Sequence, residues 1–319
     1  MPPRRAHALV GTSRRYRDRV RIRWRPAGAT LLALALAACS SASPPRARHA
    51  ARAPASTTSL SVSTTTTAAA STTAPSPTTR RTSPPTSSRP AAAGVGGLGG
   101  LGGATIAVDA GHNGGNFTHA AEILRPIFIG TQYRACDTTG TNAPDGYTEA
   151  AYTLDVSLRL ASILRAAGAN VVLTRSTNDG VGPCIDERAA IGNRAHAAVA
   201  ISVHADGGPP GGRGFHVNYP ALVPGYTEAI VGPSYRLALD LRAAYQSGTG
   251  VPPSTYVGSG GLLARSDFGG LNLSKVPKVL FETGNMRNAT DAALLESPGF
   301  RQQAAQALAT GLAAFLAGK

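Results

Sequence analysis

The stretch Thr105-Ile-Ala-Val-Asp-Ala-Gly-His112 decides the fold of this chain. Its first four residues have the composition and length of a short buried strand, and Gly111 marks a turn directly after it. A second apolar run, Ala198-Val-Ala-Ile-Ser-Val-His204, also ends in a histidine. Because sites in α/β sheets form at the carboxyl ends of strands, we expect the two histidines to belong to one site.

The chain around these two runs alternates between strand and helix patterns. Apolar residues at helical spacing predict helices, and short apolar or alternating runs predict further strands. The helices are expected at 149–167, 186–197, 228–246 and 298–317, and the further strands at 170–175, 214–219 and 277–281. This alternation is typical of a twisted, mostly parallel sheet with helices on both faces, so the predicted fold class is α/β. The segment 113–147 is predicted to be a long loop.

Composition divides the chain before the first strand. Residues 40–103 are dominated by Ser, Thr, Pro, Ala and Gly and lack the apolar periodicity that a core requires, so they are predicted to form a disordered tether. Residues 104–319 have the length of a single α/β domain. The arginines of the tether leave two interpretations open, contact with an anionic surface or a plain solvated spacer.

The net charge of +14 does not belong to the predicted domain. Residues 1–103 hold 15 of the 31 Lys and Arg residues but only one of the 17 acids, so residues 104–319 hold 16 of each. Binding of phosphates requires the charge on the folded surface or on a dedicated arm. A nucleic-acid partner is therefore not expected.

The beginning of the chain has the pattern of an export signal. An arginine-rich segment precedes the apolar stretch 27–38, which is too short to span a bilayer but suits a signal peptide. The stretch ends in Leu36-Ala-Ala-Cys39, which resembles a bacterial lipobox and predicts lipidation of Cys39. The alternative is an ordinary signal peptide with a chance cysteine. We expect residues 1–39 to be the signal peptide, with the protein anchored on the outer face of the cytoplasmic membrane.

A carboxylate accompanies the two histidines. Glu149 lies at the start of a predicted helix between the two strand-end histidines in sequence. Two histidines and one carboxylate form a catalytic zinc ligand set with one position left open for water. Each residue also has an ordinary explanation, since a histidine after a strand is often structural and an acid at a helix N-terminus is favoured by the helix dipole.

Four motifs carry a resemblance to a known family. They are Val108-Asp-Ala-Gly-His112, Tyr147-Thr-Glu149, Ala200-Ile-Ser-Val-His-Ala205 and Val279-Leu-Phe-Glu-Thr-Gly284. In order and context they resemble the zinc-dependent N-acetylmuramoyl-L-alanine amidases of the amidase-3 type, and the chain looks like an actinobacterial member. The resemblance implies a six-stranded sheet and a peptidoglycan hydrolase that cuts the amide between the lactyl group of N-acetylmuramic acid and L-alanine.

The resemblance also implies roles for individual residues. His112, Glu149 and His204 would bind Zn²⁺, and Glu282 would act as general base and then acid, although it could also be a surface or ion-paired glutamate. Asp109 is expected to orient His112 or to cap the turn rather than to bind metal. The turn Asp109-Ala-Gly-His-Asn-Gly114 departs from the commoner Asp-Pro-Gly-His-Gly-Gly.

Cys136 and Cys184 are the cysteines of the predicted domain. An exported protein with two cysteines most simply forms one disulfide, which would fasten 113–147 to the segment before the helix at 186–197. The alternative is soft ligation of zinc, which a complete ligand set elsewhere makes less favourable. His119, His196 and His216 match no motif and are expected to be structural or on the surface.

The predicted function is that of a monomeric, zinc-dependent peptidoglycan amidase of the cell envelope. Two alternatives stay open at this point. One is a catalytically inactive module that binds peptidoglycan or muropeptides, and the other is a different zinc hydrolase of the cell wall, such as a deacetylase.

Overall fold

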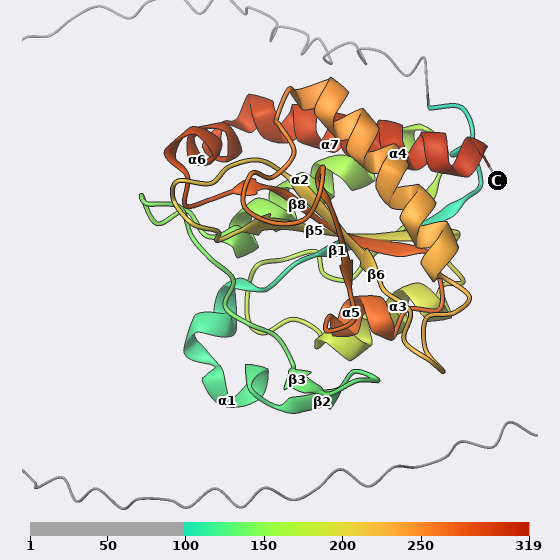
Figure 1. The fold of residues 1–319 in the computed structure, drawn as a ribbon, viewed down its shortest axis with the longest axis horizontal. Helices are drawn as coiled ribbons and strands as arrows, with labels where there is room; N and C mark the ends of the chain where they lie inside the picture. The colour runs from blue at the N-terminus through green and yellow to red at the C-terminus, as the bar shows by residue number, and fades with distance from the viewer. Residues whose placement is uncertain (1–97, 319) are drawn as a thin grey trace, which may run out of the picture. The chain divides into compact units, whose positions relative to one another are not determined.

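The computed structural model describes residues 98–318, so the predicted signal peptide, Cys39 and most of the predicted tether lie outside the described residues. The predicted α/β class and the six-stranded sheet are confirmed (Figure 1). The strands lie in the order β4-β1-β5-β8-β6-β7. Their bounds are β1 Thr105–Ala110, β4 Asn170–Leu173, β5 Val199–Asp206, β6 His216–Pro220, β7 Leu262–Arg265 and β8 Lys278–Asn285. The pairing of β6 with β8 is antiparallel and the other four pairings are parallel.

Helices cover both faces of the sheet (Figure 1). One face carries α2 (Glu149–Ala166), α4 (Val231–Thr249), α6 (Ala289–Glu296) and α7 (Pro298–Ala317), and the other carries α3 (Ile185–Arg194) and α5 (Gly269–Asn272). The Thr148 side chain caps the start of α2 by accepting a hydrogen bond from the Ala151 amide, and Gly168 follows the helix at a φ of +88°. Among the described residues, no helix has the length and apolar character needed to cross a membrane.

The two faces of the sheet differ in chemistry. Val108, Ile201 and Phe281 point toward α2, α4 and α7 and are completely buried in the main apolar core. Because strand side chains alternate between faces, their neighbours Asp109 and Ser202 point to the opposite face. That face therefore carries buried polar groups beside a small alanine-rich cluster, and it is where the predicted site residues lie.

The segment 113–147, predicted to be a loop, contains short regular elements. They are the 3₁₀ helix η1 (Gly114–Thr118), the helix α1 (Ala120–Ile123) and the hairpin of β2 (Pro126–Phe128) and β3 (Tyr133–Ala135). None is long enough to produce a periodic apolar pattern, which explains why the sequence did not indicate them. Strand β7 was also missed, since it follows the Gly- and Pro-rich stretch 248–261 directly.

The tether was predicted to extend to residue 103, but its last six residues, 98–103, pack against the folded domain. Leu98 and Leu101 belong to the main core, and the Gly103 amide donates a hydrogen bond to the Gly168 carbonyl. The glycines between the two leucines hid this short docking segment within a low-complexity composition. The folded unit therefore includes residues 98–103.

Leu101 provides a test of this boundary. Leu101→Ala removes a side chain that is 0% exposed, so we expect the free energy of unfolding to fall by about 2–5 kcal/mol. The matched control is Leu222→Ala, because the Leu222 side chain is 63% exposed and its loss should change stability by less than about 0.5 kcal/mol. Denaturant unfolding of both variants checks the prediction, and equal stability of the two would contradict it.

Candidate active site

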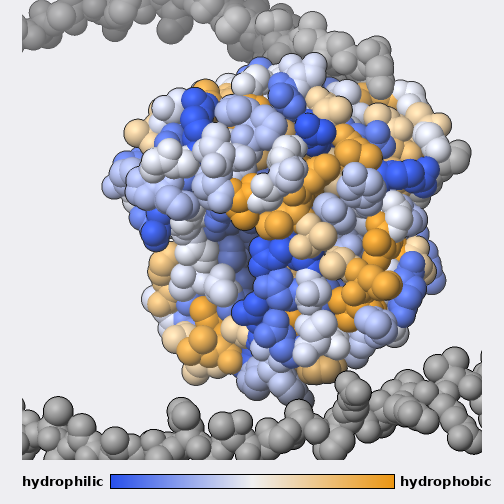
Figure 2. Space-filling view, viewed as in Figure 1, coloured by the Kyte–Doolittle hydropathy of each residue, from blue (hydrophilic) through white to orange (hydrophobic). Residues whose placement is uncertain are grey.

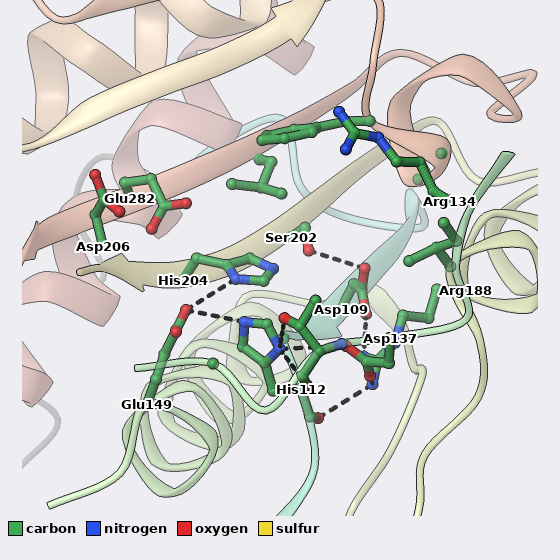
Figure 3. A pocket seen from close by; sticks show the side chains of 18 of the residues that line it. Asp109, His112, Arg134, Asp137, Glu149, Arg188, Ser202, His204, Asp206 and Glu282 are labelled. Carbon is green, nitrogen blue, oxygen red and sulfur yellow. Dashed lines mark hydrogen bonds and ion pairs between the residues drawn. The ribbon is translucent and has the colours of Figure 1, made fainter. Parts of the chain in front are cut away.

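The three residues predicted to bind metal meet in one place. His112 follows β1, His204 lies on β5 and Glu149 begins α2, and one ligand atom of each lies within 4.8 Å of the others. Oε1 of Glu149 lies 3.3 Å from Nε2 of His112 and 3.0 Å from Nδ1 of His204. All three residues line a pocket of about 570 Å³ (Figure 3).

A glycine allows the two histidines to approach each other. A Cβ atom at Gly111 would lie 2.2 Å from Cε1 of His204, so no other residue fits there without displacing the ring. His112 itself has a φ of +58°, which turns its side chain back over the end of β1. The two imidazole rings then meet edge to face with their centres 4.9 Å apart.

The His112 ring is oriented by the segment that follows the disulfide. Its Nδ1 lies 3.0 Å from the carbonyl oxygen of Thr138 and 3.2 Å from Oδ1 of Asp137. Because both partners are acceptors, we assign the proton of neutral His112 to Nδ1, which leaves Nε2 as the electron-pair donor facing Glu149.

The prediction that Asp109 orients His112 or caps the turn is wrong, because its carboxylate is occupied elsewhere. It accepts hydrogen bonds from Arg188, Thr174, Ser202 and Lys278 at 2.8 to 3.2 Å. Burial by itself would raise the pKa of Asp109, but Lys278 and Arg188 hold the pKa well below its usual range. Asp109 is therefore the centre of a buried ionic cluster beneath the pocket.

Arg188 connects this cluster to the site. Its guanidinium donates to Oδ1 of Asp109, to the Ala110 and His112 carbonyls and to Oδ2 of Asp137. One side chain on α3 thus fixes both the backbone of His112 and the carboxylate that orients its ring. Neither Asp137 nor Arg188 was predicted from the sequence to belong to the site. The only available signal was the position of Asp137 next to a cysteine of the predicted disulfide.

The predicted disulfide between Cys136 and Cys184 is present, and the alternative of cysteine ligation to zinc is not supported. It joins the residue before Asp137 to the residue that caps α3. The Ile185 amide also donates a hydrogen bond to the Cys136 carbonyl. The covalent link and the Arg188 contacts therefore tie the same two segments together.

The contacts of Glu149 favour a positive charge in the site. Burial opposes ionisation of Glu149, but the two histidines outweigh it and hold the pKa of Glu149 below its ordinary value. Burial likewise opposes a charge on His112, yet the Glu149 carboxylate raises the pKa of His112 to about 10. Glu149 is held further by the amides of Thr141 and Ala205. Two imidazole nitrogens and one buried carboxylate form a donor set that fits zinc.

Glu282 lies on β8, beside His204 in the same pocket. It pairs in register with His204 on β5 and with His216 on β6, so the three residues form one row across the sheet. Its Oε2 atom is buried and makes no hydrogen bond within residues 98–318. Burial, together with the charges of Glu149 and Asp206, raises the pKa of Glu282 well above its ordinary value. Figure 3 shows Glu282 beside Asp206, facing the His204 ring.

The other histidines of residues 98–318 lie outside the ligand set. His119 and His196 are exposed. His216 is buried, and this burial lowers the pKa of its ring to about 4, so it is neutral at physiological pH. It lies edge-on to the ring of Tyr256, whose hydroxyl donates a hydrogen bond to Asp206.

Known proteins of similar sequence and structure share this arrangement of elements. The chain is 43% identical over 211 residues to the N-acetylmuramoyl-L-alanine amidase Rv3717 of Mycobacterium tuberculosis, a match that covers 66% of this chain and 85% of the relative. The crystal structure of the N-acetylmuramyl-L-alanine amidase Ami1 from Mycobacterium smegmatis matches with a TM-score of 0.65 at 43% identity, covering 69% of this chain and 99% of that one. The apo form of Ami1 from Mycobacterium abscessus matches with a TM-score of 0.63 at 41% identity, covering 67% and 99%.

All the residues that line the pocket fall within the part of the chain that matches a family model. The family model of N-acetylmuramoyl-L-alanine amidases, of the amidase-3 type, matches residues 106–314. That range runs from β1 into α7 and contains the three candidate ligands and Glu282. The chain therefore belongs to the amidase-3 family of N-acetylmuramoyl-L-alanine amidases.

Proposed function

We propose that this protein hydrolyses peptidoglycan at the amide that joins the lactyl group of N-acetylmuramic acid to L-alanine of the stem peptide. The observation that carries the proposal is the group of His112, Glu149 and His204 beside Glu282 in one pocket. The amidase names of the relatives at 41–43% identity support the same bond as the target.

We infer that Nε2 of His112, Nδ1 of His204 and the Glu149 carboxylate hold a zinc ion. Zinc in such a site lowers the pKa of water to about 7 and polarises a carbonyl group. Asp137 and the Thr138 carbonyl contribute by keeping the His112 proton on Nδ1, so that Nε2 stays available.

Glu282 is the proposed proton carrier. Its carboxylate would accept a proton from the attacking water and then deliver it to the nitrogen of the leaving L-alanine. Burial raises the pKa of Glu282, and the charge of Glu149 raises it further. A cation beside Glu149 compensates that charge and so favours the ionised Glu282 that a general base requires.

Two other functions fit the pocket less well. An inactive wall-binding module would be expected to lack one of the ligands or Glu282, but all four residues are present and face one pocket. A deacetylase would use the same metal chemistry on an acetamido group, and its product would differ. The nature of the released product therefore separates the amidase from the deacetylase.

The proposal predicts the products of digestion and their dependence on metal. Purified protein should contain about one zinc ion per chain and should release peptides with a free L-alanine amino terminus from purified peptidoglycan. A strong chelator should abolish the release, and added zinc should restore it. Mass analysis of the digest, with metal analysis of the same sample, tests this. Full activity of a rigorously metal-free preparation, or release of acetate instead of peptides, would overturn the proposal.

The roles within the site predict different behaviour for three variants. Glu282→Gln keeps the shape of the side chain but removes its basicity, so it should retain zinc while turnover falls by about 10²-fold or more. Glu149→Gln should weaken zinc binding, and His204→Ala should lose zinc more completely. Zinc content and turnover are measured side by side. Loss of zinc from Glu282→Gln, or its turnover at the wild-type rate, would contradict the role of proton carrier.

We further propose that the protein is exported and held at the membrane by a lipid on Cys39, which lies outside the described residues. The support is the sequence Leu36-Ala-Ala-Cys39 directly after the apolar stretch. Cys39→Ala should release the protein from the membrane fraction, and the intact mass of the wild-type protein should show a lipid on residue 39. Processing at another residue without a lipid would contradict this. The monomeric state also stays a prediction.

A further inference from the structure

A positively charged wall lies in the same pocket as the candidate metal ligands. It is formed by Arg134 on β3, Arg265 at the end of β7, and Asp267 and Phe268 in the segment that follows β7. Nε and Nη2 of Arg265 donate to the Asp267 carboxylate at 2.7 and 2.8 Å, and Nη2 of Arg134 donates to the same carboxylate at 2.8 Å. Two guanidinium groups thus share one carboxylate, which leaves a net positive charge on this wall.

The Arg265 guanidinium is held in a fixed plane. Its carbon atom lies 3.8 Å from the centre of the Phe268 ring, a stacking contact that adds to the two hydrogen bonds with Asp267. Nη1 of Arg265 makes no hydrogen bond in the described part of the chain. A planar, prepositioned guanidinium with a free edge is suited to binding a carboxylate.

Arg134 is fixed by the anchoring of its hairpin. The Thr131 hydroxyl donates to the Ser266 carbonyl, and the Asn272 amide donates to the Ile129 carbonyl, both at 2.9 Å. These bonds join the turn of the β2–β3 hairpin to the segment around α5. In Figure 3, Arg134 lies on the side of the pocket away from Glu149 and Glu282. Figure 2 shows hydrophilic residues gathered in a band beside a hollow between the sheet and this hairpin.

The strand register gives the span from the reacting groups to this wall. On β6, His216 pairs with Glu282 of β8 and Pro220 pairs with Arg265 of β7. Glu282 and Arg265 are therefore four residues apart along the strands and two strand spacings apart across the sheet. These steps correspond to about 13 Å along the strands and about 10 Å across them between Cα atoms. Long side chains shorten that span from both ends. The combined Cα span of about 16 Å corresponds to four or five residues of an extended peptide at about 3.5 Å each. An arginine side chain that reaches about 6 Å into the shared pocket brings its guanidinium within about three residues of the scissile bond.

The charge of the wall selects one side of the proposed substrate. The muramic acid side of the scissile bond carries no free carboxylate at its lactyl group, because that carboxyl forms the amide to be cut. Carboxylates are available on the peptide side. We propose that Arg265, with Arg134, forms a subsite that binds a free carboxylate on the second or third residue of the stem peptide. This inference rests on the proposed function and adds a selectivity for acidic over amidated stem peptides.

The first experiment needs no variant. Two muramoyl tripeptides are compared that differ only in whether the carboxyl groups of the second and third residues are free or converted to carboxamides. We expect kcat/KM of the wild-type protein to be about 10-fold higher for the free acid, because a charge-assisted pair is replaced by a neutral contact. The preference should shrink as salt is raised, since the wall is open to solvent.

The second experiment assigns the preference to residues. Arg265→Gln should reduce the ratio of the two kcat/KM values to about 1, mainly by raising KM for the free acid. Arg265→Lys should retain part of the ratio, because lysine keeps the charge but not the planar fork. Arg134→Gln should also lower the ratio, because Arg134 and Arg265 share the Asp267 carboxylate. The matched control is Arg194→Gln, which removes an exposed, ion-paired arginine outside the pocket and should leave the ratio unchanged.

The outcomes separate this inference from the proposed function. Cleavage of neither tripeptide by the wild-type protein would refute the amidase proposal itself. Cleavage of both at equal kcat/KM would refute the subsite and leave the amidase proposal intact. A wild-type preference that persists in both Arg265→Gln and Arg134→Gln, with zinc content and melting temperature at wild-type values, would also overturn the subsite. If Arg265→Gln proves unstable, Arg134→Gln and the wild-type comparison still decide the question.

Discussion

The in-register pairing of β1, β5 and β8 is the constraint on which the site depends. It places His204 beside Glu282 in one row on the less covered face of the sheet, and the turn after β1 brings His112 over the same row. Gly111 is required because any side chain there would overlap the His204 ring. A shift of one residue in β5 or β8 would turn His204 or Glu282 toward the apolar core on the other face.

A cluster of buried charged residues beneath the pocket stabilises this arrangement. Asp109 pairs with Lys278 and Arg188, and Arg188 also pairs with Asp137 and holds the His112 backbone. Removing one member would leave an unpaired buried charge, which typically costs about 3–5 kcal/mol, so the cluster tolerates little change. The disulfide brings the same two segments together covalently. The orientation of the His112 ring is therefore determined by groups far from it in sequence.

Much of the fold and the chemical groups of the site could be predicted from the sequence. Apolar runs mark the strand before His112, the strand that contains His204 and the strand that contains Glu282, and the start of a helix marks Glu149. The residues that surround these groups and hold them in position could not be predicted in the same way. Asp137 and Arg188 contact each other although they are 51 positions apart in the sequence. Arg134 lies on a three-residue strand, which is too short to show a periodic pattern. Asp109 was assigned to His112 because it is near in sequence, whereas alternation along β1 points it at Lys278 instead.

We expect His112, Glu149 and His204 to bind one metal ion together. X-ray absorption at the zinc edge of the purified, zinc-loaded protein tests it most directly, because it identifies the atoms bound to the metal. We expect two imidazole nitrogens together with oxygen ligands at about 2.0–2.2 Å, no sulfur at about 2.3 Å, and little or no bound zinc in His204→Ala. A sulfur ligand, or a spectrum that is unchanged in His204→Ala, would contradict the account.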